Sequence, residues 1–246
     1  KNLMKILTKN NKKIYIFQNT GLGDYFSCNG IVRFIYQKNK NKNLIYLFVP
    51  ENLKKTIKLM YKDLKKLRIL IIPNKVTFEK FYADQYLKNE QNYELIKIGF
   101  DYFENQAKLH KSKKFLHKIQ VPNRTFYTCD TIFYKQLKIP FKNRYKLSYW
   151  KRNRNIENKL YNKLVIKKPY AFVHDDPERG FIIEDKFINS SLQIIRNNKK
   201  VNILHYGKIL ENANEIHVME SSIRCMIETI NTKNASHHIY MFNKKR

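Results

Sequence analysis

Apolar and polar positions follow two different rhythms over the first hundred residues. Short runs that are apolar nearly throughout predict strands at residues 14–17, 44–49, 67–72 and 94–98. Longer segments with apolar residues at helical spacing predict helices at residues 25–38, 51–66 and 76–87. Because the strands are apolar on both faces and are separated by helices, they indicate a parallel sheet that is covered on both sides.

The rhythm breaks after residue 100 and returns near residue 170. Helices are predicted at residues 101–117 and 126–137. The stretch 142–163 is dense in Lys, Arg and Asn, and we interpret it as a surface crossing that includes one helix near residues 156–164. The second half then predicts strands at residues 171–173, 201–204, 215–219 and 238–242, and helices at residues 187–197, 209–213 and 223–230.

The two α/β halves predict a fold of two doubly wound, Rossmann-like domains that face each other across a cleft. We place the N-terminal domain, with the crossing segment, at residues 1–163 and the C-terminal domain at residues 164–246. In doubly wound folds, ligands bind at the carboxyl ends of the strands. The polar loops that follow the predicted strands are therefore the places to search for chemistry.

Composition indicates a globular protein, and the cysteines are typical of a reducing compartment. Of the 246 residues, 43% are hydrophobic, which is enough to build packed cores. Cys28, Cys129 and Cys225 are too far apart for a disulfide framework or a paired-cysteine metal site. No apolar run approaches the roughly 18 residues of a membrane span, and residues 1–11 lack the apolar core of a signal peptide. We therefore expect a cytoplasmic protein.

The net charge of +29 does not by itself indicate an anionic partner. The basic residues are 39 Lys and only 10 Arg, whereas bidentate recognition of phosphates favours Arg. A solvated, Lys-rich surface is the simpler interpretation. The alternative is a genuine anionic partner, which would be nucleic acid, anionic lipid headgroups or a nucleotide-linked substrate.

The first candidate site is the loop that follows the first predicted strand. Asn19-Thr20 leads into Gly21-Leu22-Gly23-Asp24, where a helix begins. Glycines permit a close approach of the backbone, and a helix N-terminus offers unpaired N–H groups to an anion or an oxygen-rich group. The segment is neither a dinucleotide fingerprint nor a P-loop. The alternative is a tight turn in which Asp24 is an ordinary helix cap.

The second candidate site is the polar loop 174–180, which follows an apolar strand. It places His174, three carboxylates and Arg179 at the carboxyl end of that strand. A guanidinium in this position suits a pyrophosphate. One alternative is a solvated turn in which Arg179 pairs with Glu178. Another is a metal site at Asp175 and Asp176, which we do not favour because adjacent side chains rarely converge on one ion.

The third candidate site is Glu220-Ser221-Ser222, between a predicted strand and a predicted helix. The hydroxyls and the N–H groups at the helix start would hold a phosphate, and Glu220 would accept from ribose hydroxyls. The alternative is that Ser221 or Ser222 only caps the helix. His217, in the strand itself, is expected to be a partly buried, satisfied histidine, and His237-His238 is expected to be surface.

These motifs, in this order, resemble those of the heptosyltransferase-like glycosyltransferases of the GT-B fold. Gly21-Leu22-Gly23-Asp24 is similar to the opening loop of that family, and residues 209–222 resemble its late donor-site motif. Residues 170–180 are similar to a strand and loop of related proteins. The resemblance covers about a fifth of the chain directly, and the α/β rhythm supports the remainder.

The resemblance implies a sugar-transfer reaction in which each domain binds one of the two substrates. A nucleotide-diphosphate sugar would bind the C-terminal domain, and a glycan or lipid-linked acceptor would approach from the N-terminal one. Asp24 would be the general base for inverting transfer. No metal ion and no cofactor besides the donor is implied. The residues expected to hold the donor and its leaving diphosphate are His174, Arg179, Lys208, Glu220, Ser221 and Ser222.

Other interpretations stay open at the level of sequence. A basic nucleic-acid-binding α/β protein would need Lys and Arg along one continuous stripe, and we do not expect it. An inactive relative that only binds nucleotides is a further alternative, as is peripheral contact with an anionic membrane on its inner face. The glycosyltransferase hypothesis requires His174, Arg179, Glu220 and Ser221 to converge on one cleft that faces Asp24.

Overall fold

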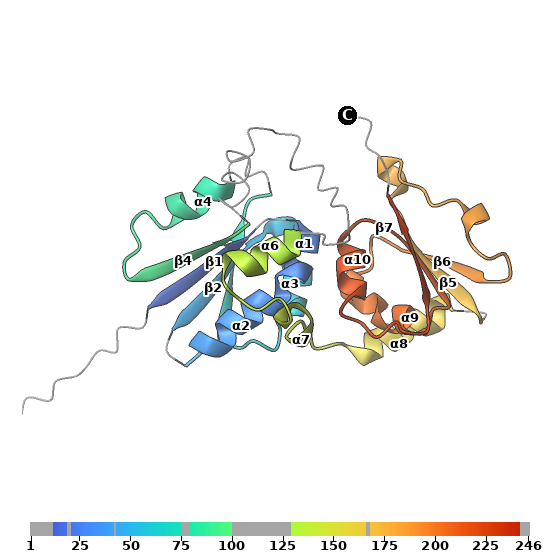
Figure 1. The fold of residues 1–246 in the computed structure, drawn as a ribbon, viewed down its shortest axis with the longest axis horizontal. Helices are drawn as coiled ribbons and strands as arrows, with labels where there is room; N and C mark the ends of the chain where they lie inside the picture. Colours follow the sequence, from blue (N-terminus) through green and yellow to red (C-terminus); the bar gives the residue numbers. More distant parts are fainter. Residues whose placement is uncertain are drawn as a thin grey trace, which may run out of the picture.

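The described part of the chain forms two parallel sheets that lie side by side, each with its own helices (Figure 1). The computed structural model describes residues 12–18, 21–41, 43–74, 79–99, 129–165 and 168–241. Within these ranges, no helix has the length and apolar character needed to cross a membrane.

The first sheet has four parallel strands in the order β3-β2-β1-β4. Along β1, Ile14 and Ile16 face the interior between the two sheets, whereas Tyr15 and Phe17 face the outer side. Apolar side chains on both faces explain why these strands have no polar alternation. The strands are β1 (Lys13–Gln18), β2 (Leu44–Pro50), β3 (Leu67–Ile72) and β4 (Tyr93–Ile98).

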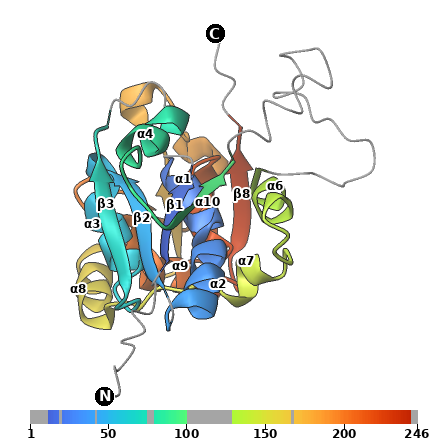
Figure 2. The ribbon, with the colours of Figure 1, turned by 90° about the vertical axis from the view of Figure 1, so that its left-hand side faces the viewer.

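Helices cover the first sheet unequally. Helix α4 lies on the outer face, where Ala83 and Leu87 pack near Phe17, and Figure 2 views the molecule from this side. The other helices of this unit lie between its sheet and the second unit. The helices are α1 (Leu22–Ser27), α2 (Asn29–Asn39), α3 (Lys54–Met60), α4 (Glu79–Tyr86), α6 (Cys129–Gln136) and α7 (Asn143–Lys146).

Two helices predicted for this unit differ from the observed ones. The helix expected at residues 25–38 is interrupted at Cys28, between α1 and α2. The helix expected at residues 51–66 is a 3₁₀ turn followed by α3, which ends at Met60. Arg33 explains this end, because its Nη2 donates to the Met60 carbonyl at 3.2 Å and its guanidinium binds the Asp63 carboxylate through Nη1 at 2.7 Å.

The second sheet has the order β6-β5-β7-β8 and is also parallel. One face packs on helices that lie toward the first unit, and Ile183 and Ile188 of a long loop pack on the other. The strands are β5 (Tyr170–His174), β6 (Gln193–Arg196), β7 (Glu215–Met219) and β8 (Ser236–Tyr240). The helices are α8 (Arg154–Leu164), α9 (Gly207–Asn212) and α10 (Ser222–Ile227).

Two elements predicted for this unit are wrong. Residues 187–197 do not form a helix, because 193–196 are strand β6, which places Ile194 and Ile195 on opposite faces of the sheet. Residues 201–204 do not form a strand. Asn202 accepts from the Leu204 N–H and starts a 3₁₀ turn, Ile203–Tyr206. The helix predicted at residues 101–117, the first residues of the one at 126–137 and the end of the last strand at Phe242 lie outside the described residues.

One apolar core is shared by the two units, in addition to a smaller apolar cluster on the outer face of each sheet. It includes Ile16 and Phe26 of the first unit together with Phe172 and Ile216 of the second. Helix α1 packs directly on α10, and α8 packs on α9 and on the 3₁₀ turn before it. The domain boundary near residue 163 stays a prediction. The shared core means that the relative position of the two sheets is set by apolar packing as well as by the connecting chain.

Gly30 marks a close approach of α2 to α7. A β carbon at this position would lie 2.3 Å from the Asn143 carbonyl oxygen and 2.5 Å from the Tyr134 hydroxyl. We expect Gly30→Ala to lower the free energy of unfolding by about 1–3 kcal/mol, because a backbone segment must move to admit the methyl group. Urea denaturation measures this change.

Gly23→Ala is the matched control for this prediction. It also adds a methyl group to a helix at a helix contact, but the nearest atoms to that β carbon lie 3.6 Å away, an ordinary contact distance. Equal losses of stability in the two variants would contradict a steric origin of the Gly30 effect.

Candidate active site

A cavity of about 490 Å³ lies between the two units. Its first wall comes from residues that follow β1 and β2, and its second wall from residues that follow β5, β6 and β7. The cavity is thus at the carboxyl ends of the strands of both sheets, where ligands bind in doubly wound folds. Its principal polar residues are Asn52, Lys55, Thr56, His174, Asp175, Asp176, Asn197, Asn198, Lys199, Lys200, Asn202 and Ser222.

His174 and Ser221 meet at the edge of this cavity. His174 is the last residue of β5, and its Nδ1 lies 3.5 Å from the Ser221 Oγ, at the limit of a hydrogen bond. Burial lowers the pKa of His174, so its imidazole is neutral near pH 7. The Ser221 side chain makes no capping hydrogen bond to α10. The capping alternative is therefore not realised at Ser221, whose hydroxyl faces the histidine.

The Gly21-Leu22-Gly23-Asp24 loop lies against the late motif. A β carbon on Gly23 would lie 3.6 Å from the Ser222 Cα, and Leu22 and Ser222 both line the cavity. Asp24 is in the first turn of α1, and a β carbon on Gly21 would lie 2.9 Å from its Oδ2. Glycine at position 21 therefore leaves room for the Asp24 carboxylate. Asn19 and Thr20 lie outside the described residues.

Arg179 forms an ion pair with Asp176, which lines the cavity. Its Nε binds the Asp176 carboxylate, and its guanidinium lies 5.3 Å above the Phe181 ring. Lys199 contacts the same carboxylate at 2.6 Å and Glu178 at 2.7 Å, so Glu178 pairs with Lys199 and not with Arg179. The hydrogen bond from Lys199 is the main reason that the pKa of Asp176 is lowered. Asp176 and Lys199 line the cavity, whereas Arg179 lies outside its lining.

Asp175 has a structural role in the second unit. Its side chain is 3% exposed, binds Arg196 and accepts from the Ile183 N–H at 3.2 Å. The buried carboxylate is therefore neutralised by a guanidinium and joins β5 to β6 and to the following loop. This pairing gives the Asp175-Asp176 metal alternative no support.

Glu220 and Lys208 lie away from the cavity lining. Glu220 pairs with Arg224 one helical turn later and is half-exposed. Lys208 donates to the Asn158 Oδ1 at 2.8 Å and lies 4.6 Å from the centre of the Tyr161 ring, in the contact between α9 and α8. Of the predicted site residues, His174 and Ser222 line the cavity and Ser221 contacts His174, whereas Asp24 is not part of the lining. Arg179, Glu220 and Lys208 are in other pairings, so the convergence that the glycosyltransferase hypothesis requires is met only by His174 and Ser221.

The sequence analysis missed the polar residues that follow β2 and β6. Lys199 and Lys200 come just after β6, which was predicted as a helix, so their place at the carboxyl end of a strand was hidden. Thr56 accepts from the Asn202 Nδ2 at 3.0 Å and joins the two walls. Pro50 ends β2, and this strand end could have indicated that the polar residues after it line the wall formed by the first unit.

The charge of the cavity is positive. Asp175 and Asp176 are both paired with cations. Lys55 and Lys200 also line it, and neither has a carboxylate partner among the residues that the structure describes. Two ammonium groups are therefore available to an anionic ligand, which the cavity walls would partly shield from water.

Sequence comparison gives no family for this chain: no family model matches it, and neither does any curated protein sequence. Solved structures do match it. A family 9 glycosyl transferase from Veillonella parvula superimposes with a TM-score of 0.53 at 9% identity, covering 100% of this chain and 90% of that one. E. coli ADP-heptose LPS heptosyltransferase II gives a TM-score of 0.45 at 8% identity over 94% and 90% of the two chains.

The chain has the GT-B fold. The predicted class, two Rossmann-like α/β units that face each other, is thereby confirmed. At 9% identity the likeness shows the fold alone. Assignment of an activity therefore depends on the chemistry of the cavity.

Proposed function

We propose that this chain is a glycosyltransferase that moves a sugar from a nucleotide-diphosphate sugar to an acceptor hydroxyl. One observation carries the proposal. In a GT-B fold, the inter-unit cavity is bounded by the carboxyl ends of strands from both sheets, and the glycine loop of the first unit lies against the Ser221-Ser222 segment of the second. Two substrates can therefore meet there, one on each unit.

The donor is assigned to the second unit. Its diphosphate needs fixed positive charge, and on that wall Lys200 supplies an ammonium group that has no carboxylate partner among the described residues. The neutral imidazole of His174 and the hydroxyls of Ser221 and Ser222 provide hydrogen bonds at the same edge. Because charge is supplied by side chains, we propose that the transfer requires no metal ion and no cofactor besides the donor.

The predicted roles of the remaining donor residues are modified by their pairings. Arg179 and Glu220 reach a ligand only by giving up Asp176 and Arg224, and Lys208 is held by Asn158. The proposal therefore assigns the leaving diphosphate to Lys200, ahead of Arg179, Lys208 and the doubly paired Lys199. Arg179 then serves mainly to fix Asp176, which in turn holds Lys199 at the cavity.

The chemical step is assigned to Asp24. As the acceptor oxygen forms its bond to the anomeric carbon, the carboxylate takes the hydroxyl proton, and the bond to the nucleotide diphosphate breaks on the opposite side, with inversion. The position of Asp24 on α1, which packs on α10 at Ser222, supports this role. The acceptor is proposed to be a glycan or a lipid-linked sugar that enters along the first unit, from the cytoplasmic side of a membrane.

Thermal-shift measurements with a panel of nucleoside diphosphates and nucleotide sugars test the proposal. A nucleotide present at 100 times its dissociation constant is expected to stabilise the protein by about 2.7 kcal/mol. Lys200→Ala is expected to weaken that nucleotide about 10- to 100-fold, because it removes a charge-assisted contact. Lys88→Ala is the matched control, since Lys88 is an exposed lysine that does not line the cavity. Absence of a response to every nucleotide would overturn the proposal.

A further inference from the structure

Four polar side chains gather on the outer face of the second sheet, away from the inter-unit cavity. Along β7, Ile216 and Val218 face the core between the units, so Glu215 and His217 face the opposite side. Parallel pairing sets His217 directly beside His238 of β8, the edge strand. Tyr240, two residues after His238, extends the group on the same face, as strand alternation requires.

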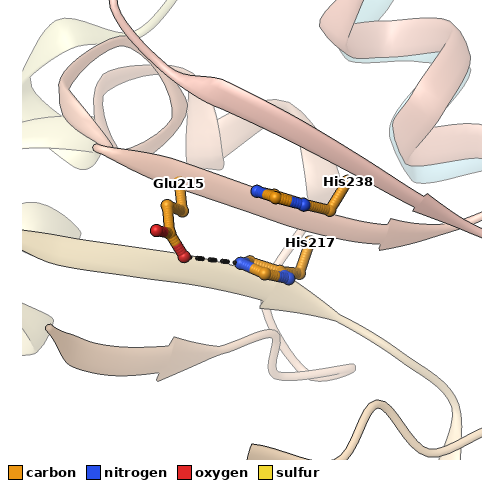
Figure 3. A group of neighbouring side chains, drawn as sticks. All are labelled: Glu215, His217 and His238. Atoms are coloured by element: carbon orange, nitrogen blue, oxygen red, sulfur yellow. Dashed lines mark hydrogen bonds and ion pairs between the residues drawn. The ribbon is translucent and has the colours of Figure 1, made fainter. Parts of the chain in front are cut away.

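The side chains lie close enough to share one ion (Figure 3). The Nε2 of His217 is 2.9 Å from the Glu215 Oε2, and one donor atom from each of Glu215, His217 and His238 lies within 4.8 Å of the others. In a tetrahedral zinc site, donor atoms about 2.0–2.1 Å from the ion are about 3.4 Å apart. The Glu215–His217 pair is already near that separation.

We propose that Glu215, His217 and His238 bind a divalent transition-metal ion of the zinc class. Two imidazoles and one carboxylate form a donor set that suits this ion, and a water molecule would complete four-coordination. A bound ion would take the place of the hydrogen bond between His217 and Glu215, and the neutral imidazole would then carry its proton on Nδ1, beside the Tyr240 hydroxyl.

Two features favour metal binding at these residues. The Nδ1 of His217 is 2.8 Å from the Tyr240 hydroxyl, which fixes the ring of this fully buried residue and directs its Nε2 toward Glu215. His238 is exposed and stacks on His217 with ring centres 4.3 Å apart. Parallel rings do not aim their lone pairs at one point, so His238 must rotate about its side-chain bonds to bind. Its exposure on the edge strand allows that rotation.

The ion would have a structural role. Glu215 also receives a weak contact from the Asn189 N–H at 3.5 Å, so the site joins β7, the edge strand β8 and the loop before β6. Edge strands have backbone groups paired on one side only, and a metal link compensates for that. Because the site is on the face opposite the cavity, this inference does not depend on the proposed sugar transfer.

Zinc binding to metal-free protein tests the proposal. Full-length protein treated with a chelator is titrated with Zn²⁺ in competition with a chromophoric chelator, and Co²⁺ is used as a spectroscopic probe of coordination. We expect one equivalent of Zn²⁺, a rise in melting temperature and visible Co²⁺ bands of tetrahedral type. His238→Ala is expected to weaken Zn²⁺ binding at least about tenfold and to remove the rise in melting temperature.

His237→Ala is the matched control. His237 is also exposed and lies on the same strand, but its side chain is on the other face, so Zn²⁺ binding should be unchanged. Tyr240→Phe keeps all three ligands and is expected to weaken binding about 10- to 100-fold by releasing the His217 ring. Binding that is equal in wild type and His238→Ala, or less than one equivalent in wild type, would overturn the proposal and leave a satisfied Tyr240–His217–Glu215 hydrogen-bond chain.

Discussion

Asp24→Asn is expected to reduce sugar transfer by about 10²- to 10⁴-fold while leaving nucleotide binding unchanged. Asparagine has nearly the shape of aspartate, so it fits the room that Gly21 leaves, but its amide does not accept a proton from the acceptor hydroxyl. The donor residues are on the other unit, so the substitution leaves their charges in place. Product formation measured by mass spectrometry, together with the thermal shift induced by the nucleotide, separates these two effects.

Asp84→Asn provides the control for this prediction. Asp84 is exposed on α4, on the outer face of the first sheet, where it pairs with Lys97. The same chemical change there should leave both transfer and nucleotide binding intact. If Asp24→Asn retains transfer within about tenfold of wild type while the nucleotide still binds, Asp24 is a residue of the helix turn and the general base must be sought elsewhere.

Arg144→Met is expected to lower the free energy of unfolding by about 3–5 kcal/mol. Arg144 on α7 is 1% exposed, and its guanidinium binds Asp130 of α6 and Glu228, which directly follows α10. It thus connects the first unit to the second. Removing it leaves two carboxylates without their shared cation, one of them only 12% exposed. Urea denaturation followed by circular dichroism measures the change.

A second substitution distinguishes charge from packing as the cause. Adding Glu228→Gln to Arg144→Met should recover part of the lost stability, because it removes a carboxylate whose remaining cation, Arg224, is 3.9 Å away. Lys54→Met serves as the exposed control: Lys54 pairs with Glu51 at 3.2 Å on the surface, and its loss should cost less than about 1 kcal/mol. Similar losses for Arg144→Met and Lys54→Met would show that the buried network does not contribute to stability.

The apolar pattern predicted most of the fold correctly where burial alone determines the element. Strand β3 at Leu67–Ile72 and strand β7 at Glu215–Met219 have the predicted bounds, because a short run of mainly apolar residues is stable only where a sheet buries at least one of its faces. Strand β6 was missed because it is only four residues long, Gln193–Arg196, and lies within a longer segment that also fits helical spacing. Its pairing with β5 is a contact that no local pattern contains.

The candidate site was predicted only in part, because some of its residues follow strands that the apolar pattern identified and others follow the strand that it missed. His174, Ser221 and the glycine loop follow strands that the pattern identified, so their meeting at one edge follows from the parallel topology. Lys199 and Lys200 follow the strand that was missed. The pairing of Arg179 with Asp176 depends on how a short loop turns back, which residue types alone do not specify.

The sequence by itself determined two α/β units with ligand-binding loops at strand ends, because hydrophobic periodicity and strand–helix alternation leave few other ways to bury these side chains. Tertiary structure alone decided which charges are available. It pairs Asp175, Arg179, Glu220 and Lys208 with neighbours, and it leaves Lys55 and Lys200 at the cavity. The physical reason is that a polar pairing depends on distances of a few ångströms, which the turn of a loop sets for Arg179, the pitch of a helix for Glu220, and the packing of distant segments for Asp175 and Lys208.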